Sequence, residues 1–100
     1  MTIQQTKQND TIVFTLKGRL DTATSPQLHD TLIPAIDGTC NIMLDFAELL
    51  YVSSAGLRVL LTAQKKCTAN GVSMKLQGVR EEIMEVFDMT GFSDILDINN

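Results

Sequence analysis

Segments with the pattern of β-strands alternate with segments with the pattern of helices along this chain, and this alternation limits the possible folds most strongly. A strand–helix–strand order predicts parallel pairing with right-handed crossovers. We therefore expect an α/β domain with a mixed, mostly parallel sheet of four to five strands and about four helices. The strands are expected at residues 3–7, 11–17, 41–46 and 72–76, and the helices are expected to start at Ser25, at the serine pair 53–54 and at residue 80.

Several residues mark where these elements should begin and end. Ser25 followed by Pro26 is typical of a helix start, with serine as N-cap and proline in the first turn. Pro34 should end that helix early, because proline cannot continue the helical hydrogen bonding. The pair Asn70-Gly71 and the single Gly91 are typical of left-handed helix ends.

The middle of the chain predicts how the sheet and its helices pack. The nearly continuous apolar run NIMLDF, residues 41–46, is typical of a strand buried on both faces. Leu57, Leu60 and Leu61 have the spacing of a helix that packs on a sheet. The end FSDILDI, residues 92–98, should form a short helical turn and an extended tail. Sites in such sheets lie where strands end and helices begin, and the serine pair lies at such a place.

Length and composition predict a single domain, residues 1–100, with an apolar content of 44% that is enough for one core. No apolar run reaches the roughly 18 residues of a membrane span. The start, MTIQQTKQND, lacks the apolar segment of a secretion signal. We therefore expect a cytoplasmic protein. In a reducing compartment Cys40 and Cys67 should be free thiols, buried or half-buried.

Charge is distributed unevenly along the chain. Residues 1–80 hold all eight Lys and Arg and six of the twelve acidic residues, whereas residues 81–100 hold the other six acids and no Lys or Arg. No basic patch with interleaved aromatic residues is present, so we expect no direct binding of DNA or RNA. The acidic end could meet a basic partner, although a solvated face is the commoner meaning of such a charge run.

The stretch YVSSAGLRVLL, residues 51–61, raises four interpretations of its serines: an N-cap, a nucleophile, a phosphate cradle or a phosphorylation site. Serine is among the best N-caps, and we expect one of the two to have this role. A nucleophile needs an activating base, but the only histidine, His29, lies in another helix and no G-x-S-x-G elbow is present. A phosphate-binding loop needs more glycines than Gly56 and a lysine closer than Lys65.

Phosphorylation of a serine at this position would leave the fold intact. A phosphate adds about −1.5 to −2 charges, and a helix N-terminus favours negative charge. The switch would therefore act on a partner surface, by repulsion and bulk. The residue pattern by itself does not select phosphorylation over a simple cap.

Three blocks of the sequence resemble the STAS domain family, the sulfate-transporter and anti-sigma-factor-antagonist domain. They are LKGRLDTATSPQL (residues 16–28), LDFAELLYVSSAGLRVLL (44–61) and VREEIMEVFDMTGFSDIL (79–96), in the family's order and spacing. The resemblance covers essentially the whole chain and implies a single STAS domain. Since no transporter part is attached, the chain is most similar to the free-standing bacterial antagonists of anti-sigma factors.

The resemblance implies a function in transcription regulation by signalling. Antagonists of this family bind an anti-sigma factor that is often also a serine kinase, and binding frees the sigma factor. The kinase phosphorylates a serine at the start of the helix after the third strand, and a phosphatase, often of the PP2C type, reverses the modification. On this chain that serine is Ser54. In many members an aspartate precedes it, where this chain has Ser53, so Ser53 is the second choice.

Other residues near the serines are implied or expected to bind the partner. Asp21 matches an acidic loop residue of the family, and its alternative role is a turn residue bonding its own backbone. Gly56 would let a partner backbone approach, or would permit tight helix–strand packing. Tyr51 and Val52 are expected to be partly exposed and to supply apolar contact. Arg58 lies off the apolar stripe, where it either reaches the partner or a phosphate or is simply solvated.

Two further functions stay open beside the antagonist. The first is an adaptor or scaffold without phosphorylation, such as a STAS-like subunit of a lipid-transport or signalling complex. The second is a nucleotide-binding domain, for which the glycine-rich motif is missing. We expect no enzymatic activity, no cofactor and no metal site.

Overall fold

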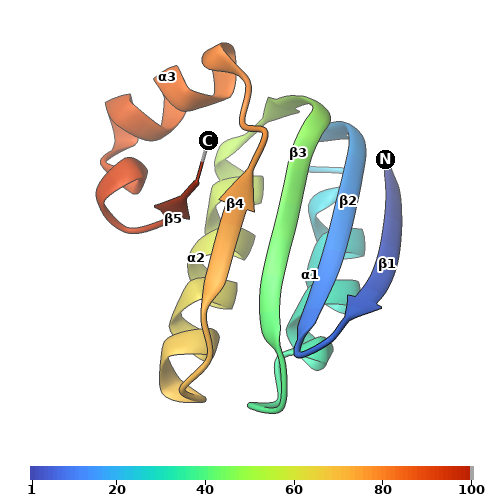
Figure 1. Cartoon of the computed structure of the whole chain (residues 1–100). Helices are drawn as coiled ribbons and strands as arrows, with labels where there is room; N and C mark the ends of the chain where they lie inside the picture. The colour runs from blue at the N-terminus through green and yellow to red at the C-terminus, as the bar shows by residue number, and fades with distance from the viewer. Residues whose placement is uncertain (100) are drawn as a thin grey trace.

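The computed structural model describes residues 1–99 as one sheet with α-helices and short 3-10 helices (Figure 1). In chain order the elements are β1 (Thr2–Gln8), β2 (Thr11–Leu20), α1 (Ser25–Leu32), η1 (Ile33–Ala35), β3 (Asn41–Val52), α2 (Ser54–Ala69), β4 (Met74–Gln77), α3 (Glu81–Thr90), η2 (Phe92–Asp94) and β5 (Asp97–Ile98). Every strand and helix expected from the sequence is present among the described residues.

The five strands lie in the sheet in chain order, from β1 at one edge to β5 at the other. β1 and β2 form an antiparallel hairpin, and the pairs β2–β3, β3–β4 and β4–β5 are parallel. Each parallel pair is connected through one of the three α-helices, as a parallel connection requires. The mixed, mostly parallel sheet predicted from the alternation of patterns is confirmed.

The α-helices cover one face of this sheet (Figure 1). The expectation that residues 41–46 are buried on both faces is therefore wrong. Ile42, Leu44 and Phe46 are buried, whereas Met43 and Asp45 are half-buried on the other face. An aspartate within the apolar run was the signal of alternation, because a strand with one covered face places every second side chain toward the core.

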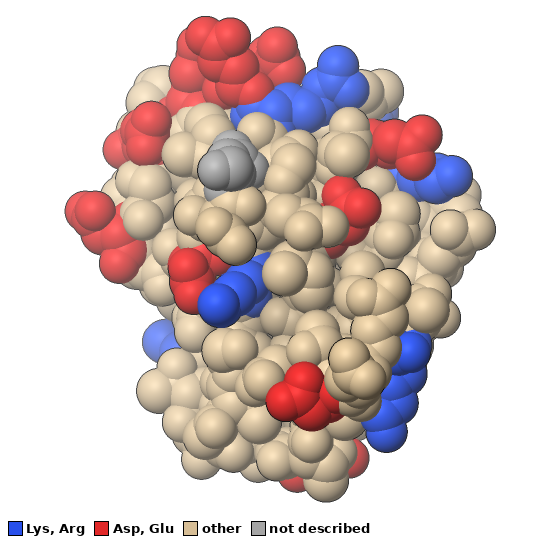
Figure 2. Space-filling view, in the orientation of Figure 1, with Lys and Arg blue, Asp and Glu red and all other residues tan. Residues whose placement is uncertain are grey.

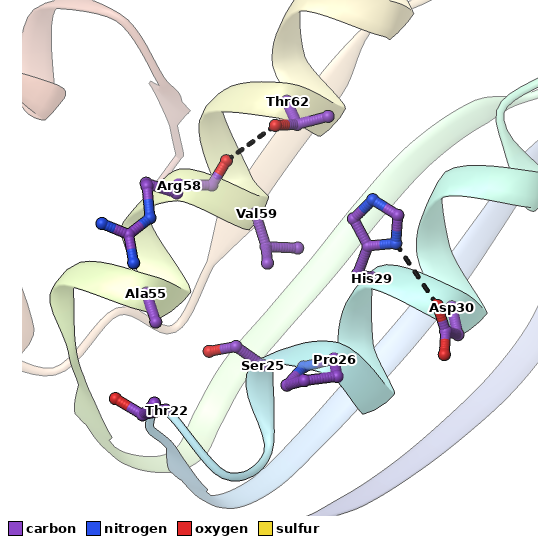
Figure 3. Close-up of a pocket in the computed structure, with 9 residues that line it drawn as sticks. All are labelled: Thr22, Ser25, Pro26, His29, Asp30, Ala55, Arg58, Val59 and Thr62. Atoms are coloured by element: carbon purple, nitrogen blue, oxygen red, sulfur yellow. Dashed lines mark hydrogen bonds and ion pairs between the residues drawn. The ribbon is translucent and has the colours of Figure 1, made fainter.

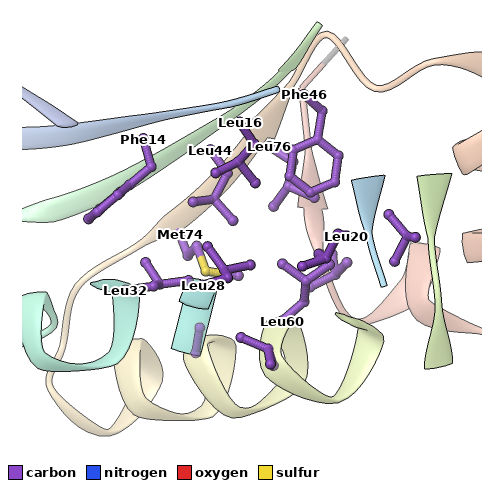
Figure 4. Close-up of a cluster of buried hydrophobic side chains, with 14 of the residues drawn as sticks. Phe14, Leu16, Leu20, Leu28, Leu32, Leu44, Phe46, Leu60, Met74 and Leu76 are labelled. Atoms are coloured by element: carbon purple, nitrogen blue, oxygen red, sulfur yellow. The ribbon is translucent and has the colours of Figure 1, made fainter. Parts of the chain in front are cut away.

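The core lies between the sheet and the helices α1 and α2 (Figure 4). Phe14 and Leu44 contribute from the sheet, and Leu28 and Leu60 contribute from the two helices; all four are fully buried. Burying a side chain of this size stabilises the folded state by about 1.5–3 kcal/mol relative to leaving it in water. This packing fixes α1 and α2 against the covered face of the sheet.

The helix ends follow the sequence signals with one correction. Ser25 is not the N-cap of α1, because Thr24 has that position and the buried Ser25 lies in the first turn, where its hydroxyl donates to the Asp21 carbonyl. The early end expected from Pro34 is confirmed by η1, which follows α1 directly. Gly91 ends α3 with a φ of +80°, a conformation that favours glycine.

The two central strands are longer than the sequence indicated, and this extension positions the site. β2 continues to Leu20 and β3 continues to Val52. Their pairing shifts by one residue twice, in segments 15–17 and 18–19 of β2, and each time β3 contains the extra residue, as in a β-bulge. An extra residue turns the following side chains to the opposite face, so the buried positions of β3 move from Phe46 to Leu49 and then to Val52.

The C-terminal part of the described chain combines packing with an acidic surface. Phe87 of α3 packs against Phe46 of β3, with ring centroids 6.3 Å apart. After η2, residues 97–98 pair with β4 as a short parallel edge strand, which confirms the expected helical turn and extended tail. In Figure 2 acidic side chains gather over the part of the molecule where Figure 1 shows α3.

Both cysteines are free thiols and both are buried. Cys67 lies on the covered side of α2, and burial raises the pKa of its thiol above the usual value. A raised pKa keeps the sulfur in its protonated, less reactive form at neutral pH. Because both side chains are buried, the two cysteines pack as small apolar residues.

Candidate functional site

The site is formed where β2 and β3 end side by side. Leu20 pairs with Val52, and the N–H of Ser53 donates to the Leu20 carbonyl at 2.8 Å. Asp21 follows one strand and Ser53 follows the other, so two loops distant in the sequence meet at one edge of the sheet. This is the edge at which sites of open α/β sheets lie.

Ser53 is the N-cap of α2. Its backbone is extended, with φ −91° and ψ 174°, and its hydroxyl oxygen accepts from the Gly56 N–H at 3.3 Å. Its carbonyl accepts the first helical hydrogen bond, from the Leu57 N–H at 2.9 Å. The prediction that one serine of the pair caps the helix is confirmed, and the residue is Ser53.

Ser54, the first residue of α2, is exposed. Within residues 1–99 its hydroxyl takes part in no hydrogen bond, because Ser53 already supplies the cap. Neither serine hydroxyl is bonded to His29, whose ring lies beside Asp30 on α1. The described residues therefore leave Ser54 without an activating base, and its hydroxyl is open to an approaching protein.

Gly56 is buried against the end of β2. A Cβ at this position would lie 2.7 Å from Cγ of Leu20 and 3.2 Å from the Leu20 carbonyl oxygen, closer than such atoms normally approach. Of the two roles considered for Gly56, the structure supports tight helix–strand packing. The missing side chain lets the first turn of α2 lie directly on the strand that leads to Asp21.

The carboxylate of Asp21 organises its own loop. It accepts from the N–H groups of Ala23 at 3.1 Å and Thr24 at 3.0 Å. The Thr24 hydroxyl lies 3.1 Å from the same carboxylate oxygen and donates to the Arg19 carbonyl at 2.7 Å. These contacts, first the Thr24 N–H and then its hydroxyl, lower the pKa of the Asp21 carboxyl below its usual value. The expected turn role is confirmed, and Asp21 directly follows Leu20, whose carbonyl accepts from the Ser53 N–H.

The end of β3 presents apolar surface next to the serines. Tyr51 is 40% exposed, and the Arg19 guanidinium lies over its ring at 4.2 Å from the centroid. Leu50, which lies beyond the strand expected at residues 41–46 and was not identified as a site residue from the sequence, is 57% exposed. The expectation that Val52 is partly exposed is wrong: it is 4% exposed, because the second bulge of β3 turns it toward the core.

A shallow groove of about 370 Å³ runs between α1 and α2 beside the start of α2 (Figure 3). Pro26 and His29 contribute from α1, and Ala55, Arg58 and Val59 contribute from α2. Arg58 is exposed, as its position off the apolar stripe predicts. Figure 3 shows its guanidinium beside the helix turn that carries Ala55.

Two other surface pockets, of about 520 Å³ and about 550 Å³, are larger than this groove, and neither serine lines them. Across residues 1–99, His, Cys, Asp and Glu form no group of three or more that could hold a metal ion. None of the helices in the same range is long and apolar enough to cross a membrane. The fold and the site thus define a small α/β domain that presents one uncommitted serine hydroxyl at a helix start.

Comparison with known proteins places this domain in a family. The STAS domain profile matches residues 2–100. The chain is 31% identical over 94 residues to the anti-sigma-B factor antagonist of Bacillus subtilis (strain 168), which covers 93% of this chain and 86% of that protein. The chain belongs to the STAS domain family, as its three sequence blocks predicted.

Solved structures share the fold. An anti-sigma factor antagonist from Mycobacterium paratuberculosis superposes with a TM-score of 0.87 at 16% identity and covers 97% of this chain and 83% of that one. The Bacillus cell fate determinant SpoIIAA in its phosphorylated form superposes with a TM-score of 0.76 at 22% identity and covers 99% and 92%. At these identities the structures establish a common architecture.

Proposed function

We propose that this chain is an anti-sigma factor antagonist whose binding is switched off by phosphorylation of Ser54. The main support for the proposal is that the two serines have different roles: Ser53 caps the helix and Ser54 is exposed. The Bacillus subtilis relative is named an anti-sigma-B factor antagonist, which supports the same function here.

The partner surface in this proposal surrounds Ser54. It consists of exposed or half-buried side chains from both loops, from the end of β3 and from the start of α2: Asp21, Leu50, Tyr51, Ser53, Ser54 and Arg58. Val52 and Gly56 support this surface from beneath, since both are buried. An apolar centre of leucine and tyrosine with polar groups around it is the usual composition of a protein interface.

The proposed partner is an anti-sigma factor that is also a serine kinase. It transfers the γ-phosphoryl group of ATP to the Ser54 oxygen; the oxygen–phosphorus bond forms, ADP leaves, and the serine proton passes to a base of the kinase. A phosphatase of the PP2C type would reverse this step by hydrolysis, so that water replaces the serine oxygen on phosphorus and inorganic phosphate leaves. The chain itself contributes the hydroxyl and the docking surface.

Phosphorylation would affect binding and not folding, because the Ser54 hydroxyl takes no part in the hydrogen bonds of the described residues. A phosphate at the first residue of α2 lies where the helix favours negative charge, and the Ser53 cap is untouched. An interface that closed over a neutral hydroxyl must then accommodate about two negative charges and three more oxygens. Desolvation and crowding of the phosphate therefore raise the free energy of the complex, whereas the free domain keeps its fold.

The test is phosphosite mapping by mass spectrometry with the serine-kinase anti-sigma factor encoded nearest to this chain in its genome. After incubation with ATP, we expect one added phosphoryl group on Ser54. The Ser54→Ala variant should bind the kinase and gain no phosphoryl group, whereas the matched Ser53→Ala variant should still be modified. Binding without modification, or modification confined to Ser53, would contradict the proposal. Capture of a transporter ATPase in place of a kinase would favour the adaptor function.

A further inference from the structure

Arg58 lies one helical turn after Ser54 on the exposed side of α2. Both residues are exposed, and residues four apart on a helix have their Cβ atoms about 5–6 Å from each other. Helical side chains lean toward the N-terminus, so a long side chain at position 58 extends over the turn that contains position 54. In Figure 3 the Arg58 guanidinium lies beside that first turn, near Ala55.

The Arg58 guanidinium also has no polar partner among the described residues. The other arginines have partners, since Arg19 stacks on Tyr51 and Nε of Arg80 lies 3.8 Å from the Glu82 carboxylate. Within residues 1–99 the Arg58 guanidinium forms no hydrogen bond and no ion pair. A flexible, fully charged group therefore lies one helical turn from Ser54, and it would break no existing hydrogen bond or ion pair on binding a phosphate.

We propose that Arg58 binds the phosphate of phosphorylated Ser54 within the same chain, an inference that rests on the proposed modification of Ser54. A guanidinium offers two parallel N–H donors that match two phosphate oxygens, and such charge-assisted pairs are among the stronger hydrogen bonds. The neighbouring charged groups have other partners: the Asp21 carboxylate is held by its own loop and Arg19 stacks on Tyr51. On the facing helix α1, His29 and Asp30 line the same groove as Arg58 and lie 3.4 Å from each other.

This pairing changes what the partner meets. The unmodified chain presents a free hydroxyl and a free cation side by side on α2. After modification the guanidinium is bound to the phosphate, so the partner loses a positively charged contact and encounters a bulky, net negative pair. One phosphorylation event thus alters two docking groups, and the complex is weakened by the loss of an attraction as well as by repulsion.

The test uses the full chain with phosphoserine installed at position 54 during synthesis, so that no kinase is needed. Phosphorus NMR gives the second pKa of the phosphate, which is near 6 for free phosphoserine. Because Arg58 stabilises the dianion, the pKa should rise by about 0.2–0.4 unit in Arg58→Gln, the range for an exposed pair on a helix. Lys65→Gln makes the same charge change far along α2 and should leave the phosphate pKa close to that of the parent.

A second readout separates pairing from general charge. Phosphorylation should raise the melting temperature of the parent chain more than that of Arg58→Gln, while Arg58→Lys should retain part of the difference. Equal phosphate pKa values in the parent and Arg58→Gln, or equal shifts in Arg58→Gln and Lys65→Gln, would overturn the inference. Since the phosphate is installed chemically, these results stand apart from whether any kinase modifies Ser54, which the mapping experiment decides.

Discussion

The starts of α1 and α2 lie side by side, yet they use their hydroxyl groups in opposite ways. At the start of α1, the Thr24 hydroxyl donates to the Arg19 carbonyl at the end of β2, and the Ser25 hydroxyl donates to the Asp21 carbonyl in the preceding loop. At the start of α2, Ser53 supplies the cap and Ser54 is exposed. The comparison teaches that a hydroxyl becomes available to a partner when its neighbour already satisfies the backbone.

The largest effect in this comparison should come from adding a methyl group at the start of α2. In Gly56→Ala the new Cβ meets Cγ of Leu20, and overpacking of this kind costs about 1–3 kcal/mol of the free energy of unfolding. Urea denaturation followed by circular dichroism measures the loss. The same substitution in a Leu20→Ala background is the control and should cost much less. Equal losses in both backgrounds would show that the contact with the Leu20 side chain does not explain the glycine.

A smaller loss should separate the two serines. Ser53→Ala removes the cap and should lower the free energy of unfolding by about 1 kcal/mol. Ser54→Ala is the matched variant and should change it by less than about 0.5 kcal/mol, as surface substitutions usually do. Urea midpoints of the two variants provide the measurement. A loss in Ser54→Ala as large as that in Ser53→Ala would contradict the division of roles.

The smallest effect should appear as a pH dependence at the start of α1. The pKa of Asp21 is lowered in the folded chain by bonds to Thr24, so its carboxylate stabilises the fold above its unfolded pKa. This contribution is lost as the pH falls through the lowered folded pKa. The difference in urea midpoint between the parent and Asp21→Asn should therefore shrink in acid. Asp30→Asn controls for the change in net charge, and a difference that stays constant with pH would contradict this role.

The sequence predicts the architecture well because its signals are local. The alternation of strand and helix patterns, the stop at Pro34 and the end at Gly91 each depend on a few neighbouring residues. What the sequence does not predict depends on pairing between strands. The bulges that turn Val52 inward and leave Leu50 outside arise from the register of β3 on β2, which has no local signature here.

The candidate site shows the same limit. The pattern predicts that one serine caps the helix, but only the backbone geometry assigns the cap to Ser53. Likewise the role of Gly56 was open until the distance to Leu20 was known, because the two residues are far apart in the sequence. Spacing alone predicts that Ser54 and Arg58 are neighbours, since four residues are one turn of a helix.

The most direct test of the account is a calorimetric titration of the anti-sigma factor with two forms of the full chain, one unmodified and one with phosphoserine at position 54. We expect phosphorylation to weaken binding by about 1–3 kcal/mol, roughly 5- to 150-fold in Kd, while the urea midpoint of the free domain does not fall. Equal affinities of the two forms would contradict it, and so would a weaker affinity that arises because the phosphorylated domain has unfolded.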